Sequence, residues 1–176
     1  KGRRLAAPAG RVARPTADRT REALFNILAH SEHVELDGAV VVDCFAGSGG
    51  LGLEALSRGA ADASFVESHP DSLKALTANI ADLREGERAT VLRCDATKLP
   101  PARMPCTLAL LDAPYNSDLS APCLLALARQ GWLAPGALCV VEVAAKEAFT
   151  PPAGFTQVDE RTYGAAKLVF LLAPES

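Results

Sequence analysis

The amino-acid sequence predicts an α/β fold built on a mostly parallel, doubly wound sheet. Three observations favour this fold class. Five short apolar runs alternate with helix-like segments along residues 39–143, which is the rhythm of βαβ units. The runs are almost continuously apolar, as strands are when helices cover both faces of a sheet. A glycine-rich loop directly follows the first run, where such sheets bind nucleotides.

The expected elements follow from hydrophobic periodicity and from helix start and stop signals. A helix over residues 14–30 has Thr16 or Asp18 as its cap and one apolar face. The strand candidates that follow it are Ala39–Val42, Ser64–Glu67, Thr90–Arg93, Thr107–Leu111 and Leu138–Val143. The helices between them are Leu51–Arg58, which Gly59 can end, then Pro70–Arg84 and Ala121–Gln130. Two final runs, Phe155–Arg161 and Lys167–Leu172, have no helix between them, so we expect an antiparallel hairpin at one edge of a seven-stranded sheet.

Length and composition limit the class of protein. A chain of 176 residues fits one domain with a substantial core. No apolar run approaches the ~18 residues that span a bilayer, and the N-terminal segment is basic rather than apolar. The five cysteines form no CxxC pair, which is typical of reduced core cysteines in a cytoplasmic protein. We therefore expect a cytoplasmic monomer with no metal and no membrane partner.

Charge is distributed unevenly along the chain. Residues 1–22 contain seven basic and two acidic side chains, a local charge of +5, whereas the whole chain has −3 and the remainder therefore −8. Glycines and prolines separate the basic stretches of residues 1–15, so we expect an arm or hairpin there, ahead of a single domain over residues 16–176. A basic arm on an acidic body favours contact with phosphate groups. The alternative at this point is an arm that is merely solvated.

The glycine loop lies in the stretch "VVDCFAGSGGLGLEAL". Gly47, Gly49 and Gly52 match the spacing G-x-G-x-x-G between a strand and a helix, so a nucleotide-like ligand is expected at the helix N-terminus. Glycine permits close approach of the backbone to such a ligand. The pattern alone does not separate enzymes that bind NAD or FAD from methyltransferases.

Three acidic residues make the prediction more specific. Asp43, Glu67 and Asp95 end three successive predicted strands. A carboxylate at Asp43 suits a cationic group and would repel a pyrophosphate, Glu67 can accept ribose hydroxyls, and Asp95 lies where an adenine amino group is expected. Together they favour S-adenosylmethionine as the cofactor over NAD, although each acid could instead cap the helix that follows it. The predicted cofactor site also includes Thr16, Phe45, Ala46, Ser48, Ser68 and Ala96.

The fourth predicted strand ends in "DAPY", residues Asp112, Ala113, Pro114 and Tyr115. This strand lies next to the first across the topological switch point, where ligands bind. The four residues resemble the (Asp/Asn/Ser)-Pro-Pro-(Tyr/Phe) motif of methyltransferases that act on exocyclic amino groups or amides. Such nitrogens are poor nucleophiles, so the Asp112 carboxylate and the Ala113 carbonyl are expected to accept their N–H groups, while Tyr115 stacks on an extruded base. Positioning and electrostatics would then dominate catalysis.

Nearly the whole chain resembles the RsmD family of bacterial methyltransferases. The similar stretches include "GRRLAAPAGRVARPTADRTREALFNIL", "DCFAGSGGLGLEALSRGA", "GWLAPGALCVVEV" and "RTYGAAKLVFLL". The resemblance implies a Rossmann-like, S-adenosylmethionine-dependent methyltransferase fold. It also implies methylation of guanine N2 in 16S ribosomal RNA, within a small ribosomal subunit or its assembly intermediate. The basic arm would then contact RNA through Lys1, Arg3, Arg4, Arg11 and Arg14.

One residue departs from the family pattern, because Ala113 stands where the family has the first of two prolines. The backbone carbonyl is retained, but the rigidity that proline gives to φ is lost. Pro114 still favours an extended Ala113, so we expect activity to persist.

Three other functions compete with this prediction. The same chemistry could act on a DNA base or a protein glutamine. DNA enzymes of this motif class usually carry an extra target-recognition region, and a glutamine substrate would not give the steep salt dependence that phosphate contacts require. A dinucleotide-dependent oxidoreductase is the second alternative, although no proton-relay pair accompanies the glycine loop. The third is an RNA-binding module without activity, which only Ala113 favours.

Overall fold

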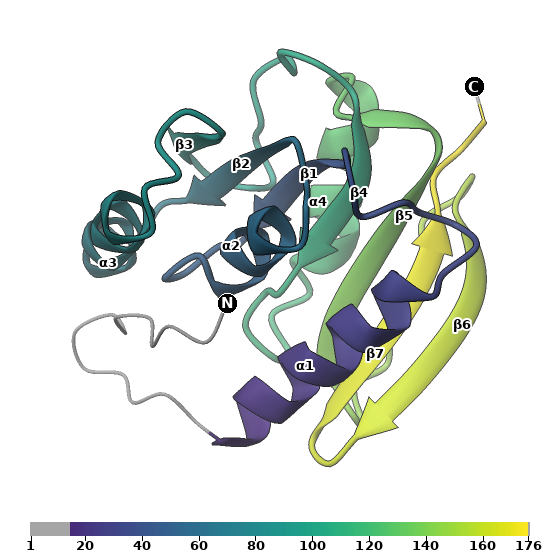
Figure 1. Ribbon diagram of the computed structural model, residues 1–176. Coiled ribbons are helices and arrows are strands. Elements are labelled where there is room, and N and C mark those ends of the chain that lie inside the picture. The colour runs from purple at the N-terminus through teal and green to yellow at the C-terminus, as the bar shows by residue number, and fades with distance from the viewer. Residues whose placement is uncertain (1–14, 176) are drawn as a thin grey trace.

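The computed structural model describes the backbone of residues 15–175 and the side chains of residues 17–175. Seven strands form one sheet in the order β3-β2-β1-β4-β5-β7-β6 (Figure 1). The helices are α1 (Pro15–Ala29), α2 (Gly50–Ser57), α3 (Pro70–Asp82) and α4 (Ser120–Arg129). The strands are β1 (Val40–Cys44), β2 (Asp62–Glu67), β3 (Ala89–Arg93), β4 (Cys106–Leu111), β5 (Leu133–Ala144), β6 (Thr156–Tyr163) and β7 (Ala166–Leu172).

The predicted sheet topology is confirmed. Strands β3, β2, β1, β4 and β5 pair in parallel, and β7 pairs antiparallel with both β5 and β6. The chain runs from β1 outward to β3, then returns to β4 on the other side of β1. The carboxyl ends of β1 and β4 therefore flank the switch point, where a crevice is expected.

Helices cover both faces of the sheet (Figure 1). Side chains of α1, α2 and α3, such as Phe25, Leu56 and Leu76, share one apolar cluster with Phe65 of β2. The opposite cluster places α4 against the other face, where Leu124 lies. This two-sided burial explains why the central strands are apolar at almost every position. Four of the five cysteines are buried here, and all five are free, as expected for core residues.

Strand β5 is longer than the sequence predicts. It begins at Leu133 rather than Leu138, although Pro135 and Gly136 indicate a turn in the sequence. The ladder to β4 pairs Cys106 with Leu133 and then Leu108 with Leu138, so its register shifts between these pairs. Pro135 and Gly136 therefore lie in an irregularity that interrupts the pairing without ending the strand.

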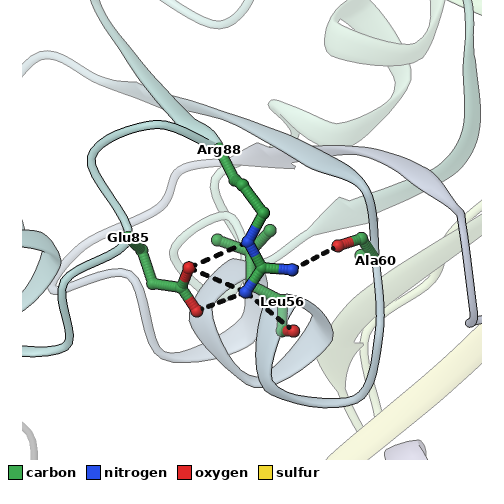
Figure 2. Close-up of polar contacts among 4 residues, drawn as sticks. All are labelled: Leu56, Ala60, Glu85 and Arg88. Atoms are coloured by element: carbon green, nitrogen blue, oxygen red, sulfur yellow. Dashed lines mark hydrogen bonds and ion pairs between the residues drawn. The ribbon is translucent and has the colours of Figure 1, made fainter.

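The C-terminal end of α2 is held in two ways. Gly59 has φ +107°, and its N–H and that of Ala60 donate to the carbonyls of Leu56 and Ala55 (3.2 and 3.0 Å), which is a Schellman ending. Arg88 then donates to the carbonyls of Ala60 (2.8 Å) and Leu56 (3.3 Å), as Figure 2 shows.

Glu85 fixes the Arg88 side chain in this position. Its carboxylate accepts from the guanidinium Nε at 2.9 Å and from NH2 at 2.6 Å (Figure 2). The guanidinium thus links the end of α2 to the segment that precedes β3.

None of the helices among residues 15–175 combines the length and the apolar character that crossing a membrane requires.

Candidate active site

The glycine loop joins β1 to α2, and its glycines serve different purposes. Gly47 and Gly49 have φ of +57° and +90°, a region that side chains with a Cβ rarely adopt. A Cβ on Gly49 would lie 2.5 Å from Leu76, and one on Gly52 would lie 2.4 Å from Phe65. A Cβ on Gly47 would meet nothing within 4 Å.

The prediction was that all three glycines allow a ligand to approach the backbone, but they differ in what surrounds them. Gly49 and Gly52 are required by packing of α2 against β2 and α3, whereas only Gly47 has open space before it. The amide side chain of Asn79 in α3 also donates to the carbonyl of Ser48 at 2.9 Å. The loop is therefore preformed by contacts within the protein, including one from a residue that the sequence did not indicate.

Asp43 is a buried carboxylate at the end of β1. Its exposed fraction is 1%, and Oδ2 accepts a hydrogen bond from the Gly52 N–H at 2.9 Å. Burial raises the pKa of the Asp43 carboxyl well above its usual range; the bond from Gly52 lowers it, and the charges of Asp112 and Glu67 raise it further. A carboxylate that is desolvated beside other acids favours a cation as its neighbour.

Glu67 lies at the end of β2, as predicted, and already has backbone partners. Oε1 accepts from the Gly47 N–H at 2.8 Å, and Oε2 accepts from Ser68 and His69 at 3.0 and 2.8 Å. Glu67 thus also organises the backbone just before α3, which is the alternative role considered for the acids at the strand ends. The two carboxylate oxygens have about four lone pairs between them, and these three bonds leave one on Oε1 for a hydroxyl.

Asp95 follows β3 and organises the turn after it. Oδ1 accepts from the backbone N–H and the hydroxyl of Thr97 at 2.8 and 2.7 Å, and these bonds lower the pKa of its carboxyl. Asp95 is exposed and Ala96 is buried. Since β1, β2 and β3 are adjacent and parallel, Asp43, Glu67 and Asp95 follow one edge of the sheet in order.

A cleft of about 250 Å³ opens between α1, the glycine loop and the ends of β4 and β5. Of the predicted cofactor residues, it is lined by Asp43, Phe45, Ala46, Gly47 and Ser48. Asp112 of the predicted catalytic motif also lines it. The backbone N–H of Asp112 donates to the carbonyl of Cys44 at 3.3 Å, which joins the ends of β1 and β4 at the switch point. Glu67, Ser68, Gly49, Asp95 and Ala96 lie outside the lining of this cleft.

The lining also includes residues that the sequence did not indicate. Helix α1 contributes Ala17, Asp18, Thr20, Arg21 and Leu24, and β5 contributes Glu142. The apolar face of α1 was visible in its periodicity, but its role as one wall of the cleft depends on tertiary packing. The Asp18 carboxylate accepts a hydrogen bond from the Arg21 guanidinium at 3.3 Å. Arg21 is the one basic residue among the described lining residues.

The motif residues at the end of β4 lie side by side with different exposure. Ala113 is buried at 4%, whereas the Tyr115 side chain is exposed at 42%, and Asp112 and Pro114 are exposed. The Tyr115 hydroxyl donates to Glu142 Oε2 at 2.7 Å. An exposed aromatic ring beside an accessible carboxylate suits recognition of a planar, amino-bearing group.

The predicted RNA-binding residues Lys1, Arg3, Arg4, Arg11 and Arg14 lie outside the described residues. Thr16 belongs to the first turn of α1, and its side chain is outside them as well.

The fold is that of Rossmann-like, S-adenosylmethionine-dependent methyltransferases. It matches the solved structure of an RNA methyltransferase from Salinibacter ruber in complex with S-adenosyl-L-homocysteine, with a TM-score of 0.64 and 16% identity over 94% of this chain and 95% of that one. At that identity the likeness concerns the fold alone.

The chain belongs to the family described as Conserved hypothetical protein 95, whose model matches residues 1–172. It is 38% identical to the ribosomal RNA small subunit methyltransferase D of Escherichia coli strain K12, over 93% of this chain and 81% of that protein. The solved structure of yhhF from Escherichia coli is 35% identical and superimposes with a TM-score of 0.83, covering all of this chain and 94% of that one. This is the family that the motifs resemble.

Proposed function

We propose that the protein transfers a methyl group from S-adenosylmethionine to the exocyclic N2 of a guanine in 16S ribosomal RNA. Family membership supports methylation of ribosomal RNA, since the named relatives are ribosomal RNA small subunit methyltransferases. The finer assignment to guanine N2 is what the resemblance to the RsmD family implies, and one observation supports an exocyclic amino group as the acceptor. Asp112 lines the cleft beside Asp43, and the exposed ring of Tyr115 lies next to it.

The cleft suits the amino-acid end of S-adenosylmethionine. Four of its described lining residues are acids (Asp18, Asp43, Asp112 and Glu142), so it favours a ligand with positive charge. Asp43 is assigned to the ammonium group. Arg21 is assigned to the carboxylate, because a guanidinium binds a carboxylate with two parallel hydrogen bonds. Glu67 and Asp95 continue along the sheet edge toward the ribose and adenine.

The acceptor nitrogen needs help because its lone pair is delocalised into the guanine ring. We assign the Asp112 carboxylate and the Ala113 carbonyl as acceptors for its two N–H groups, which directs the lone pair toward the cleft. S-adenosylmethionine supplies an electrophilic methyl group, whose transfer forms an N–C bond as the C–S bond breaks and leaves the electron pair on sulfur. The proton released from nitrogen can pass to water.

Tyr115 is assigned to stacking on the target base. A base must leave its helix before its amino group can reach the cleft, and base–aromatic stacking stabilises the extruded form by ~1–3 kcal/mol. The five basic residues of the arm are assigned to the RNA backbone. Their phosphate contacts would position the substrate without reading its sequence.

A methyl-transfer assay tests this function directly. Purified protein, labelled S-adenosylmethionine and small ribosomal subunits that lack their native methylations would be incubated, and the RNA digested for nucleoside mass spectrometry. N2-methylguanosine is the expected product. A different methylated nucleoside would refute the assignment to guanine N2, and transfer only to duplex DNA or to a glutamine peptide would refute RNA as the substrate.

A second arm of the assay addresses Ala113. The variant Ala113→Pro restores the family's two prolines, so it should match or exceed the wild-type rate. If only Ala113→Pro were active, the natural residue at this position would be the cause of an inactive protein.

A further inference from the structure

The loop between β4 and α4 presents the predicted target-base residues, and its backbone is left-handed at two positions. Asn116 and Asp118 have φ of +59° and +57°, a region that Asn and Asp adopt more readily than other residues with a Cβ. The alanine at position 113 also removes one proline that would restrict the loop. Two contacts from outside the loop hold it in this shape.

The first such contact comes from β5, the neighbouring strand. Leu111 pairs with Val141, which places Glu142 level with Asp112 at the end of the sheet. Glu142 Oε2 accepts the Tyr115 hydroxyl at 2.7 Å. Burial raises the pKa of Glu142 and this hydrogen bond lowers it, so the bond stabilises the ionised carboxylate. The Tyr115 side chain remains 42% exposed, so its hydroxyl is held while part of the ring stays accessible.

The second contact comes from the turn after β5. Glu147 Oε1 accepts from the backbone N–H of Asn116 at 2.9 Å and from that of Ala144 at 3.0 Å. One carboxylate oxygen thus joins a left-handed residue of the loop to the last residue of β5. Glu147 is itself held, because Lys167 of β7 donates to its backbone carbonyl at 3.1 Å.

We propose that Glu142 and Glu147 are positioning residues for the methyl transfer: Glu142 orients the ring of Tyr115, and Glu147 fixes the backbone of the loop at Asn116. The inference rests on the proposed role of Tyr115 in stacking on the target base. A stacking surface that is already ordered loses little conformational entropy when the base arrives, and small errors in its position reduce the rate strongly. The two contacts supply rigidity that a second proline would otherwise give.

A double-mutant cycle tests the role of Glu142. Tyr115→Phe retains the ring and removes the hydroxyl, and Glu142→Leu removes the acceptor. If the bond between them is what orients the ring, each single variant lowers kcat/KM by about tenfold, as expected for a hydrogen bond to a charged group. The double variant then falls no further than either single variant. Glu142→Gln retains an acceptor oxygen and should recover most of the rate.

Two outcomes of this cycle would overturn the role of Glu142. The losses of the two single variants could multiply in the double variant, which would mean that the residues act independently. Alternatively, Tyr115→Phe could retain the full rate, which would mean that the hydroxyl does not orient the ring. The affinity for S-adenosylmethionine, measured by calorimetry, separates an effect on the cofactor from an effect on the base.

Amide hydrogen exchange tests Glu147 without relying on activity. Glu147→Ala should raise the exchange rate of the Asn116 amide by about tenfold or more. It should also lower kcat, because the ring of Tyr115 is then less well placed to stack on the base. Glu147→Gln should restore both the exchange rate and kcat, because its amide oxygen can accept the same bonds. Glu54→Gln is the matched control, since Glu54 is a half-buried glutamate in an ion pair with Arg58 on α2. It should change neither measurement.

The two measurements distinguish failure of this inference from failure of the proposed function. Unchanged exchange at Asn116 in Glu147→Ala would refute the anchoring of the loop. Faster exchange with an unchanged methylation rate would refute its importance for catalysis. If the wild-type protein made no N2-methylguanosine while Glu147→Ala still exchanged faster, the proposed function would be wrong and the structural role of Glu147 would stand.

Discussion

Two aspartates at the ends of adjacent strands have opposite environments. Asp43 is 1% exposed and bonded to the Gly52 amide, whereas Asp112 is exposed at the end of β4. Both line the same cleft. A desolvated carboxylate interacts strongly with a cation and an exposed one is accessible to an incoming substrate, so the environments match the assigned roles in binding and in catalysis.

Asp43 should reduce the stability of the ligand-free protein. Its folded-state pKa is raised above an unfolded value of ~3.9, so ionisation costs free energy in the folded state as the pH rises above about 4. In Asp43→Asn this cost is absent and the Gly52 N–H keeps an acceptor. The melting temperature of the variant relative to wild type should therefore increase between pH 4 and 7, while its affinity for S-adenosylmethionine falls. Parallel melting curves across this pH range would contradict the prediction.

Asp112→Ala should abolish most turnover and leave the cofactor bound. Removing one preorganised acceptor from the reacting group lowers kcat by about 100-fold or more. The Kd for S-adenosylmethionine, measured by calorimetry, should stay near the wild-type value. Asp112→Asn retains one acceptor oxygen and should fall between the two; a wild-type rate in Asp112→Ala would refute the role of this carboxylate.

Arg21 should discriminate between ligands with and without an amino-acid group. Arg21→Gln is expected to weaken S-adenosylmethionine binding about tenfold, because it loses a charge-assisted bond to the carboxylate. Binding of 5′-methylthioadenosine, which lacks this carboxylate, should not change. Equal losses for both ligands would place Arg21 away from the carboxylate.

Helix α2 is fixed at both ends, and its function depends on its N-terminus. At that end, the glycine loop and the bond from Gly52 to Asp43 set where the backbone meets the cleft. At the other end, Arg88 and the Schellman turn satisfy carbonyls that a helix leaves without partners. The two ends of this eight-residue helix are therefore held by separate sets of contacts.

Arg88→Ala should lower stability without altering the cleft. The variant loses the bonds to Ala60, Leu56 and Glu85 shown in Figure 2, and such a loss costs about 1–3 kcal/mol. For a chain of this size, each kcal/mol lowers the melting temperature by roughly 2–4 °C. Calorimetry gives this shift, and the Kd for S-adenosylmethionine at low temperature serves as the control. Arg88→Lys should not restore stability, since a single ammonium group cannot reproduce the planar arrangement of N–H donors in a guanidinium.

At the scale of the whole molecule, the N-terminal end of α1 lies at the cleft. Helix α1 begins at Pro15, and Ala17 and Asp18 in its first turn line the cleft. The basic residues of the proposed arm directly precede this helix in the sequence, and residues 1–22 have a charge of +5 while the rest of the chain has −8. An acidic body repels phosphates, so RNA attracted by the arm would be directed to this side of the molecule.

RNA binding should therefore weaken steeply with salt. Each phosphate contact contributes about 0.7–0.9 to the slope of log K against log salt concentration. Replacement of Arg3 and Arg4 by glutamine should reduce this slope by roughly 1–2, measured by fluorescence anisotropy between 50 and 200 mM salt. Arg129→Gln, on α4, is the control. A slope unchanged by the arm substitutions would mean that the arm does not contact phosphates.

Hydrophobic periodicity was sufficient to predict the order and type of the helices and strands among residues 15–175, and the position of the C-terminal hairpin. The apolar runs report burial on both faces, which only a helix-covered parallel sheet provides. The limits of β5 could not be predicted in this way, because Pro135 and Gly136 indicate a turn, whereas in the structure they form an irregularity within the strand.

The sequence by itself determined the fold class, the glycine loop, and the acids and motif at the strand ends, because parallel strands bring their carboxyl ends to one edge. Tertiary structure alone decided the rest of the site. Arg21 lines the cleft because α1 packs over it, and Glu142 and Glu147 reach the loop after β4 because β5 is its neighbour in the sheet. Contacts between residues about 30 positions apart depend on strand order and on side-chain direction, and neither leaves a periodic pattern in the sequence.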